Sequence, residues 1–86
     1  MYKTVVVLVI LFLTENETYK SSVASESYKD METCKAELDR RELDFRREYS
    51  ENKWLVVNRY SPKVLRVQDI DKQIQHFECL ESWIVE

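Results

Sequence analysis

The 86-residue sequence predicts one compact α+β domain spanning residues 1–86: an antiparallel β-sheet of three to five strands with one long amphipathic helix packed on one face. Three observations predict this class. Residues 4–13 are almost continuously apolar, residues 29–51 repeat apolar side chains with a helical period, and two short segments after the helix are aromatic and β-branched. The expected order is strand, strand, helix, strand, strand, followed by a C-terminal segment that is either a strand or a short helix.

Residues 4–13, TVVVLVILFL, carry the strongest strand signal. A continuous apolar run is typical of a central strand that is covered on both faces, and we expect that arrangement here. A secretory signal peptide is the alternative, because Lys3 precedes the run and the small residues 22–24 could form a cleavage site. The run has about half of the roughly 20 apolar residues that a membrane-spanning helix needs, so we expect no membrane insertion.

A hairpin is expected directly after this strand. Thr14–Glu17 is polar and predicts a turn, in which Asn16 is the residue expected to adopt positive φ because the chain has no glycine. Residues 18–25 partly alternate between apolar and polar side chains, which predicts the second strand.

The segment 29–51 predicts the helix. Ser27 or Asp30 is expected to cap its first turn. Apolar residues three, four or seven positions apart form a single stripe, which we expect to face the sheet: Met31, Cys34, Leu38, Phe45 and Tyr49. Most other positions carry acids and bases spaced four apart, which indicates a solvated face.

The remaining third of the chain predicts further strands. Residues 54–60 and 64–68 are expected to be the third and fourth, separated by Ser61 and Pro62. Residues 71–84 fit two structures. Ile70, Ile74 and Phe77 are spaced for a helix, whereas a strand would place Phe77, Cys79 and Trp83 on one face.

The two cysteines, Cys34 and Cys79, lie 45 residues apart in the sequence. A disulfide between them would stabilise the fold by about 4 kcal/mol on the loop-entropy model. In a reducing cytosol the same residues would be free thiols packed as small apolar side chains. The sequence alone leaves both states open.

Composition excludes several function classes. Without glycine there is no phosphate-cradling loop, and one histidine with two cysteines cannot form an ordinary four-ligand zinc site, so we expect no cofactor. The net charge of −3 argues against nucleic-acid binding. His76 and Cys79 are three residues apart, but no flexible loop is available to build an oxyanion site, and we expect no enzyme.

The order of features resembles that of small α+β proteins encoded by phages and prophages. The segment YKDMETC, residues 28–34, opens a charged helix after an apolar N-terminal strand, and FEC, residues 77–79, comes late in the chain. The resemblance implies a strand–strand–helix–strand layout and a protein that binds and blocks one host protein, including defence systems. Residues 61–71 and Trp83 have no counterpart in that layout.

The leading functional expectation is therefore a non-enzymatic protein-binding module, a phage-type inhibitor of a host protein in the cytoplasm. Exposed charge beside aromatic residues is typical of interface anchors, and on this basis we expect the contact residues to be Arg40, Arg47, Trp54, Arg59, Tyr60 and Trp83. Two alternatives stay open: a self-associating homodimer that pairs exposed edge strands, and a small secreted protein stabilised by a disulfide.

Overall fold

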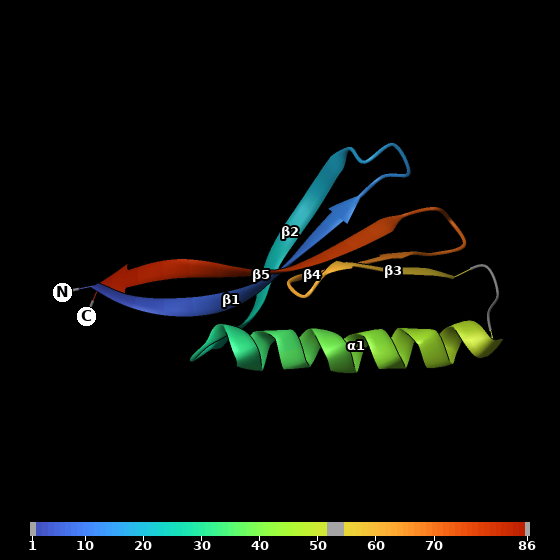
Figure 1. The fold of residues 1–86 in the computed structure, drawn as a ribbon. Helices are drawn as coiled ribbons and strands as arrows, with labels where there is room; N and C mark the ends of the chain where they lie inside the picture. The colour runs from blue at the N-terminus through green and yellow to red at the C-terminus, as the bar shows by residue number, and fades with distance from the viewer. Residues whose placement is uncertain (1, 52–54, 86) are drawn as a thin grey trace.

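A computed structural model describes residues 2–51 and 55–85, with the backbone alone for residues 2, 49–51, 84 and 85. In this part of the chain, one helix lies across one face of a five-stranded antiparallel sheet (Figure 1). The elements are β1 (Tyr2–Leu13), β2 (Tyr19–Tyr28), α1 (Met31–Glu51), β3 (Val56–Ser61), β4 (Val64–Gln68) and β5 (Ile74–Val85). The strand order in the sheet is β2-β1-β5-β4-β3. The predicted α+β class is confirmed, with the chain order β-β-α-β-β-β.

The C-terminal segment is a strand and not a helix. β5 pairs with β1 over the full length of both strands, from Tyr2 opposite Val85 to Leu13 opposite Ile74. It occupies the centre of the sheet, since β4 pairs with its other edge. The helical spacing in this segment is overridden by these long-range backbone hydrogen bonds, which a short isolated helix could not match.

Both long hairpins turn without glycine. In the β1–β2 turn the amide of Glu17 donates to the carbonyl of Thr14 over 2.8 Å, and Glu17 has φ of 61°. The β4–β5 turn repeats this geometry: the amide of Lys72 donates to the carbonyl of Asp69 over 2.9 Å, and Lys72 has φ of 63°. The expectation of positive φ at Asn16 is therefore wrong by one residue, because the left-handed residue follows the tight turn instead of lying within it.

Asp30 caps the helix. Its Oδ1 accepts hydrogen bonds from the backbone amide of Thr33, 2.8 Å away, and from the hydroxyl of Thr33, 2.7 Å away. These bonds hold the pKa of the Asp30 carboxyl below its ordinary value, the hydroxyl of Thr33 having the larger effect. The other expected cap, Ser27, lies within β2 opposite Val7.

The core lies between α1 and the sheet. It consists of side chains from α1, β1, β4, β5 and the segment before β3: Val6, Leu8, Cys34, Leu38, Leu55, Leu65, Val67, Phe77 and Cys79. The rings of Phe45 and Phe77 meet with their centroids 5.8 Å apart. A disulfide joins Cys34 of α1 to Cys79 of β5, with Cα atoms 6.1 Å apart, and both residues are buried. It links the helix covalently to the central strand.

β1 is not buried along both faces, so the expectation of a strand covered on both faces is wrong for most of its length; on the second face, Leu13 is buried, at 7% exposed. Val6 and Leu8 point toward α1 and are 4% and 0% exposed. The alternate residues Val5, Val7 and Val9 point to the opposite face and are only half-buried. The cause is the layer structure of the described residues, whose one helix, α1, packs on the Leu8 side of the sheet.

Candidate functional site

The two ends of the described chain form a two-stranded ribbon that projects from the domain. In this ribbon, residues 2–5 of β1 pair with residues 82–85 of β5. Pairing between β1 and β2 begins only at Val6, and pairing between β4 and β5 ends at Glu78. Figure 1 shows the ribbon extending past the first turn of α1, with both chain ends at its tip. We refer to residues 2–5 and 82–85 as the ribbon.

One edge of β5 leads from the sheet onto the ribbon without a partner strand. The amide of Cys79 donates to the carbonyl of Lys63 over 3.0 Å, just before β4 begins. Backbone groups of alternate residues in a strand point to the same edge, so Glu81 and Trp83 present their amides and carbonyls on the edge that Cys79 uses. Within the described residues, no strand continues beside them. This edge offers backbone hydrogen bonds to an added strand.

Trp83 is the most exposed of the large apolar side chains of the described residues, at 67%. It lies opposite Thr4 in the register and thus on the same side of the strands as Val6, the side on which α1 packs further along the sheet. On the other side of β5, Leu80 is 43% exposed and lies opposite Val7. An indole held on a narrow ribbon has little of its surface covered by its own chain.

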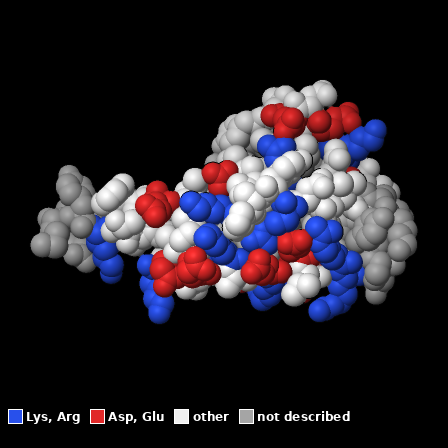
Figure 2. Space-filling model, in the orientation of Figure 1, with Lys and Arg blue, Asp and Glu red and all other residues white. Residues whose placement is uncertain are grey.

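The side chains of Arg40 and Arg47 on α1 are 60% and 78% exposed. Acidic and basic side chains alternate on the surface of the molecule (Figure 2). Arg40 forms ion pairs with Glu37 and with Asp44, the latter at 3.1 Å, and Arg47 lies 3.7 Å from Asp44. The hydrogen bond from Arg40 is the main cause that lowers the pKa of Glu37. Both arginines therefore belong to a neutralised helix surface and not to a basic patch.

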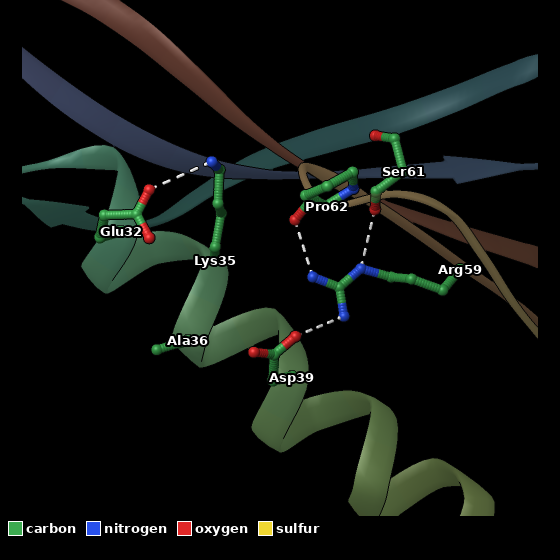
Figure 3. A pocket seen from close by; sticks show the side chains of 7 residues that line it. All are labelled: Glu32, Lys35, Ala36, Asp39, Arg59, Ser61 and Pro62. Atoms are coloured by element: carbon green, nitrogen blue, oxygen red, sulfur yellow. Dashed lines mark hydrogen bonds and ion pairs between the residues drawn. The ribbon is translucent and has the colours of Figure 1, made fainter.

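Arg59 is held inside the fold, between α1 and the β3–β4 turn. Its side chain is 16% exposed, and Nη1 donates to Asp39 Oδ1 at 2.8 Å and to Glu42 Oε1 at 2.9 Å. Its Nε donates to the carbonyl of Ser61 at 2.9 Å and Nη2 to that of Pro62 at 2.7 Å. Arg59 closes one side of an open pocket of about 580 Å³ (Figure 3). With its donors satisfied internally, it positions the turn against the helix.

Tyr60 lies on the sheet face opposite α1, beside a chain of polar contacts. Arg66 stacks on the Tyr60 ring, 5.6 Å from its centroid, forms an ion pair with Glu17 and donates from Nε to His76 Nδ1 at 2.8 Å. Nε2 of His76 lies 2.8 Å from Glu78 Oε1. Both ring nitrogens of His76 are therefore occupied, which leaves neither free to take a proton from a substrate.

The expected contact residues do not form one surface. Arg40 and Arg47 lie on the helix and Arg59 is internal. Tyr60 lines the same pocket as His76, and the seven residue steps from His76 to Trp83 along β5 span about 24 Å of extended chain. Trp54 lies outside the described residues. Of the set, Trp83 and Tyr60 have side chains exposed on strands with an open edge, Trp83 on the ribbon and Tyr60 on the edge strand β3. Trp83 lies where β1 and β5 pair without a third strand beside them.

No protein-family model matches the chain, and no similar curated protein or solved structure was found. In the part of the chain that the structure describes, no cluster of three or more His, Cys, Asp or Glu residues could hold a metal ion. Nor does α1 have the length and apolar character needed to cross a membrane.

Proposed function

We propose that this protein is a non-enzymatic protein-binding module that contacts its partner through the ribbon. The observation that carries the proposal is Trp83, an indole 67% exposed beside an unpaired strand edge. Tryptophan is among the residues most enriched at the centres of protein interfaces, because it buries a large apolar area at low entropic cost. A two-stranded ribbon is marginally stable by itself, so a partner that covers it also stabilises it.

The binding mode that the ribbon favours is strand addition. An extended segment of the partner would accept and donate hydrogen bonds at the backbones of Glu81 and Trp83 while the indole packs against it. This mode uses main-chain groups for affinity and one aromatic side chain for selectivity. Together with the resemblance to phage proteins, it supports an inhibitor that acts by occluding a segment of a host protein.

The test is capture of a partner from a bacterial lysate by immobilised protein. Trp83→Ser removes the indole, and Glu81→Pro removes an outward amide while leaving the β1 side of β5 unchanged. Each variant should lose at least about tenfold in affinity for the captured protein, since a hot-spot residue contributes 2 kcal/mol or more. Tyr60→Ser is the matched control, because it removes an equally exposed aromatic side chain, 64%, from the other sheet region.

Circular dichroism of each variant establishes that the fold is retained. Equal capture by wild type, Trp83→Ser and Glu81→Pro would overturn the proposal, as would a wild-type protein that retains nothing from the lysate. Loss of capture in Tyr60→Ser alone would move the contact to the face of the sheet opposite α1.

The disulfide favours a second candidate, an exported protein stabilised by a covalent link. Disulfides persist in oxidising compartments and are rare in the cytosol. A buried Cys34–Cys79 pair is consistent with folding outside the cytoplasm, where a small core benefits most from such a link. Intact mass with thiol labelling of protein produced in the cytoplasm and in the periplasm tests this. Full labelling of both cysteines in the periplasmic product would exclude it.

A further inference from the structure

His76 is the single histidine of the chain, and both of its ring nitrogens have partners. Nε of Arg66 donates to Nδ1 over 2.8 Å, and Nε2 lies 2.8 Å from Oε1 of Glu78. The side chain of His76 is 12% exposed, so the ring has little contact with water. Histidine is the side chain whose ordinary charge change falls between about pH 5 and pH 8. A change in its protonation therefore acts directly on these two contacts.

The register of the sheet brings these three side chains together. Arg66 of β4 lies directly opposite His76 of β5, and Glu78 follows two positions later on the same face of β5. Phe77, which lies between them in the sequence, points into the core toward α1. The three polar side chains therefore lie on the sheet face opposite α1.

The contacts determine which ring nitrogen of His76 carries the proton. A guanidinium group has only hydrogen-bond donors and stays charged in proteins, so Nε of Arg66 cannot accept a hydrogen bond from the ring. Nδ1 of His76 must be unprotonated to accept the bond that Arg66 donates. The ring proton of the neutral imidazole then lies on Nε2, which donates it to the carboxylate of Glu78. The fold thus holds His76 as the neutral Nε2–H tautomer.

The other groups that face His76 come from three elements. On the β1 side, the residue opposite His76 is the uncharged Leu11. From the β1–β2 turn, Glu17 forms an ion pair with Arg66, and the hydrogen bond from Arg66 is the main cause that holds the pKa of Glu17 below its ordinary value of 4.5. Glu17 is therefore charged wherever a histidine titrates. From β3, the ring of Tyr60 lies over the guanidinium of Arg66, 5.6 Å from it.

Two lysines of the hairpins have partners of their own. Lys72 lies 3.9 Å from a carboxylate oxygen of Glu15, and Nζ of Lys20 donates to Gln73 over 3.1 Å. α1 packs on the opposite face of the sheet. The charged groups around the imidazole are therefore one arginine and two glutamates, each in contact with the ring or with the arginine.

Protonation of His76 is incompatible with this arrangement. A proton from solvent on Nδ1 converts the acceptor of the Arg66 bond into a donor, so the hydrogen bond is lost and two cations are left side by side. The bond to Glu78 is kept, because Nε2–H is a donor in both states of the ring. The guanidinium of Arg66 therefore has to move relative to the imidazole, and its stacking on Tyr60 changes with it.

We propose that His76, Arg66 and Glu17 form a pH-sensitive switch that joins β5, β4 and the β1–β2 turn. While His76 is neutral, Arg66 is held by the imidazole, by Glu17 and by the ring of Tyr60. When His76 is protonated, Arg66 keeps Glu17 alone, and the lining of the adjoining open pocket of about 420 Å³ gains one positive charge. The proposal goes beyond the ribbon function and does not depend on it.

The test is NMR spectroscopy of the isotope-labelled full chain as a function of pH. Because the chain has one histidine, its ring-nitrogen signals are unambiguous. At about pH 7.5, Nδ1 should have the chemical shift of an unprotonated ring nitrogen and Nε2 that of a protonated one. A nitrogen–nitrogen scalar coupling should then connect Nε of Arg66 to Nδ1 through the hydrogen bond. At about pH 5 the coupling should be lost, and the ring signals of Tyr60 should shift with the same midpoint as the imidazole.

His76→Gln is the matched control, because glutamine keeps a donor and an acceptor at this position but does not titrate. Its Tyr60 signals should stay constant between about pH 8 and pH 5. A wild type with the ring proton on Nδ1 at the higher pH, without the coupling there, or with an imidazole still neutral and coupled at the lower pH would overturn the proposal. Tyr60 signals that shift equally in His76→Gln would also overturn it.

The wild-type spectra decide the proposal by themselves if the glutamine variant does not fold. No partner is present in these measurements, so their outcome is separate from the outcome of the capture experiment on the ribbon.

Discussion

Removal of the Cys34–Cys79 disulfide should cost a large part of the free energy of unfolding. The bond closes a loop of 45 residues that includes most of α1 and all of β3 and β4. On the loop-entropy model, opening such a loop destabilises the native state by about 4 kcal/mol. A chain of this length has a total stability of about 4–13 kcal/mol, so the loss is between a third and all of it.

Two perturbations separate the bond from the packing of its sulfur atoms. Reduction of the wild type leaves both thiols in the core and should remove only the cross-link, about 4 kcal/mol. The variant Cys34→Ala/Cys79→Ala also removes both sulfur atoms from the core, where Cys34 and Cys79 are 0% and 2% exposed, and should lose about 1–2 kcal/mol more.

Urea denaturation followed by circular dichroism measures both losses, provided that the transition is two-state. The reduced protein should unfold at a much lower urea concentration than the oxidised wild type, and the double variant at a lower concentration still. If both retain stability within about 1 kcal/mol of the oxidised protein, the cross-link does not constrain the unfolded chain, and the reasoning from loop length is refuted.

Four further predictions follow from the packing of the described residues. Arg59→Ala should destabilise the fold by about 2–3 kcal/mol in urea denaturation, because the mostly buried guanidinium and its charge-assisted hydrogen bonds are lost. Arg59→Lys should retain part of these bonds, and an unchanged midpoint for Arg59→Ala would contradict the prediction. Lys72→Gly should stabilise the fold by about 1 kcal/mol in the same assay, because Lys72 has φ of 63°, which glycine adopts without steric cost. A lower midpoint would show that residue 72 does not adopt positive φ in solution. Phe77→Ala should cost about 3–5 kcal/mol and Phe77→Leu much less, because the ring is 1% exposed in the core; equal midpoints would place the ring elsewhere. Hydrogen bonds from neighbouring arginines lower the pKa of Glu37 and Glu42. The two carboxylates should therefore contribute fully to stability above the ordinary pKa of 4.5, and this contribution should be lost as pH falls through the lower native pKa. Thermal midpoints that stay constant from pH 6 to about pH 3 would contradict this.

The sequence determined most of the elements because their signals are local. The helical period from Met31 to Phe45 and the cap at Asp30 lie within a few residues of the groups that they affect, and the apolar run of β1 identifies a strand wherever it is placed. The pairs of opposite charge along α1 could likewise be expected from spacing alone, and the ion pair between Arg40 and Asp44 is one of them.

Only the tertiary structure decided the features that depend on distant segments. Residues 74–85 form a strand because β1, more than 60 positions earlier, supplies their backbone partners. The spacing within this segment fits both a strand and a helix, and it does not identify the partner that decides between them. Arg59 is internal because Asp39 and Glu42 of α1 accept its hydrogen bonds. Trp83 is exposed because the paired ends of β1 and β5 extend beyond the residues that pair with β2 and β4. The half-buried face of β1 also depends on the tertiary structure. Its apolar residues Val5, Val7 and Val9 favour burial, but whether they are buried depends on how many layers pack against the sheet.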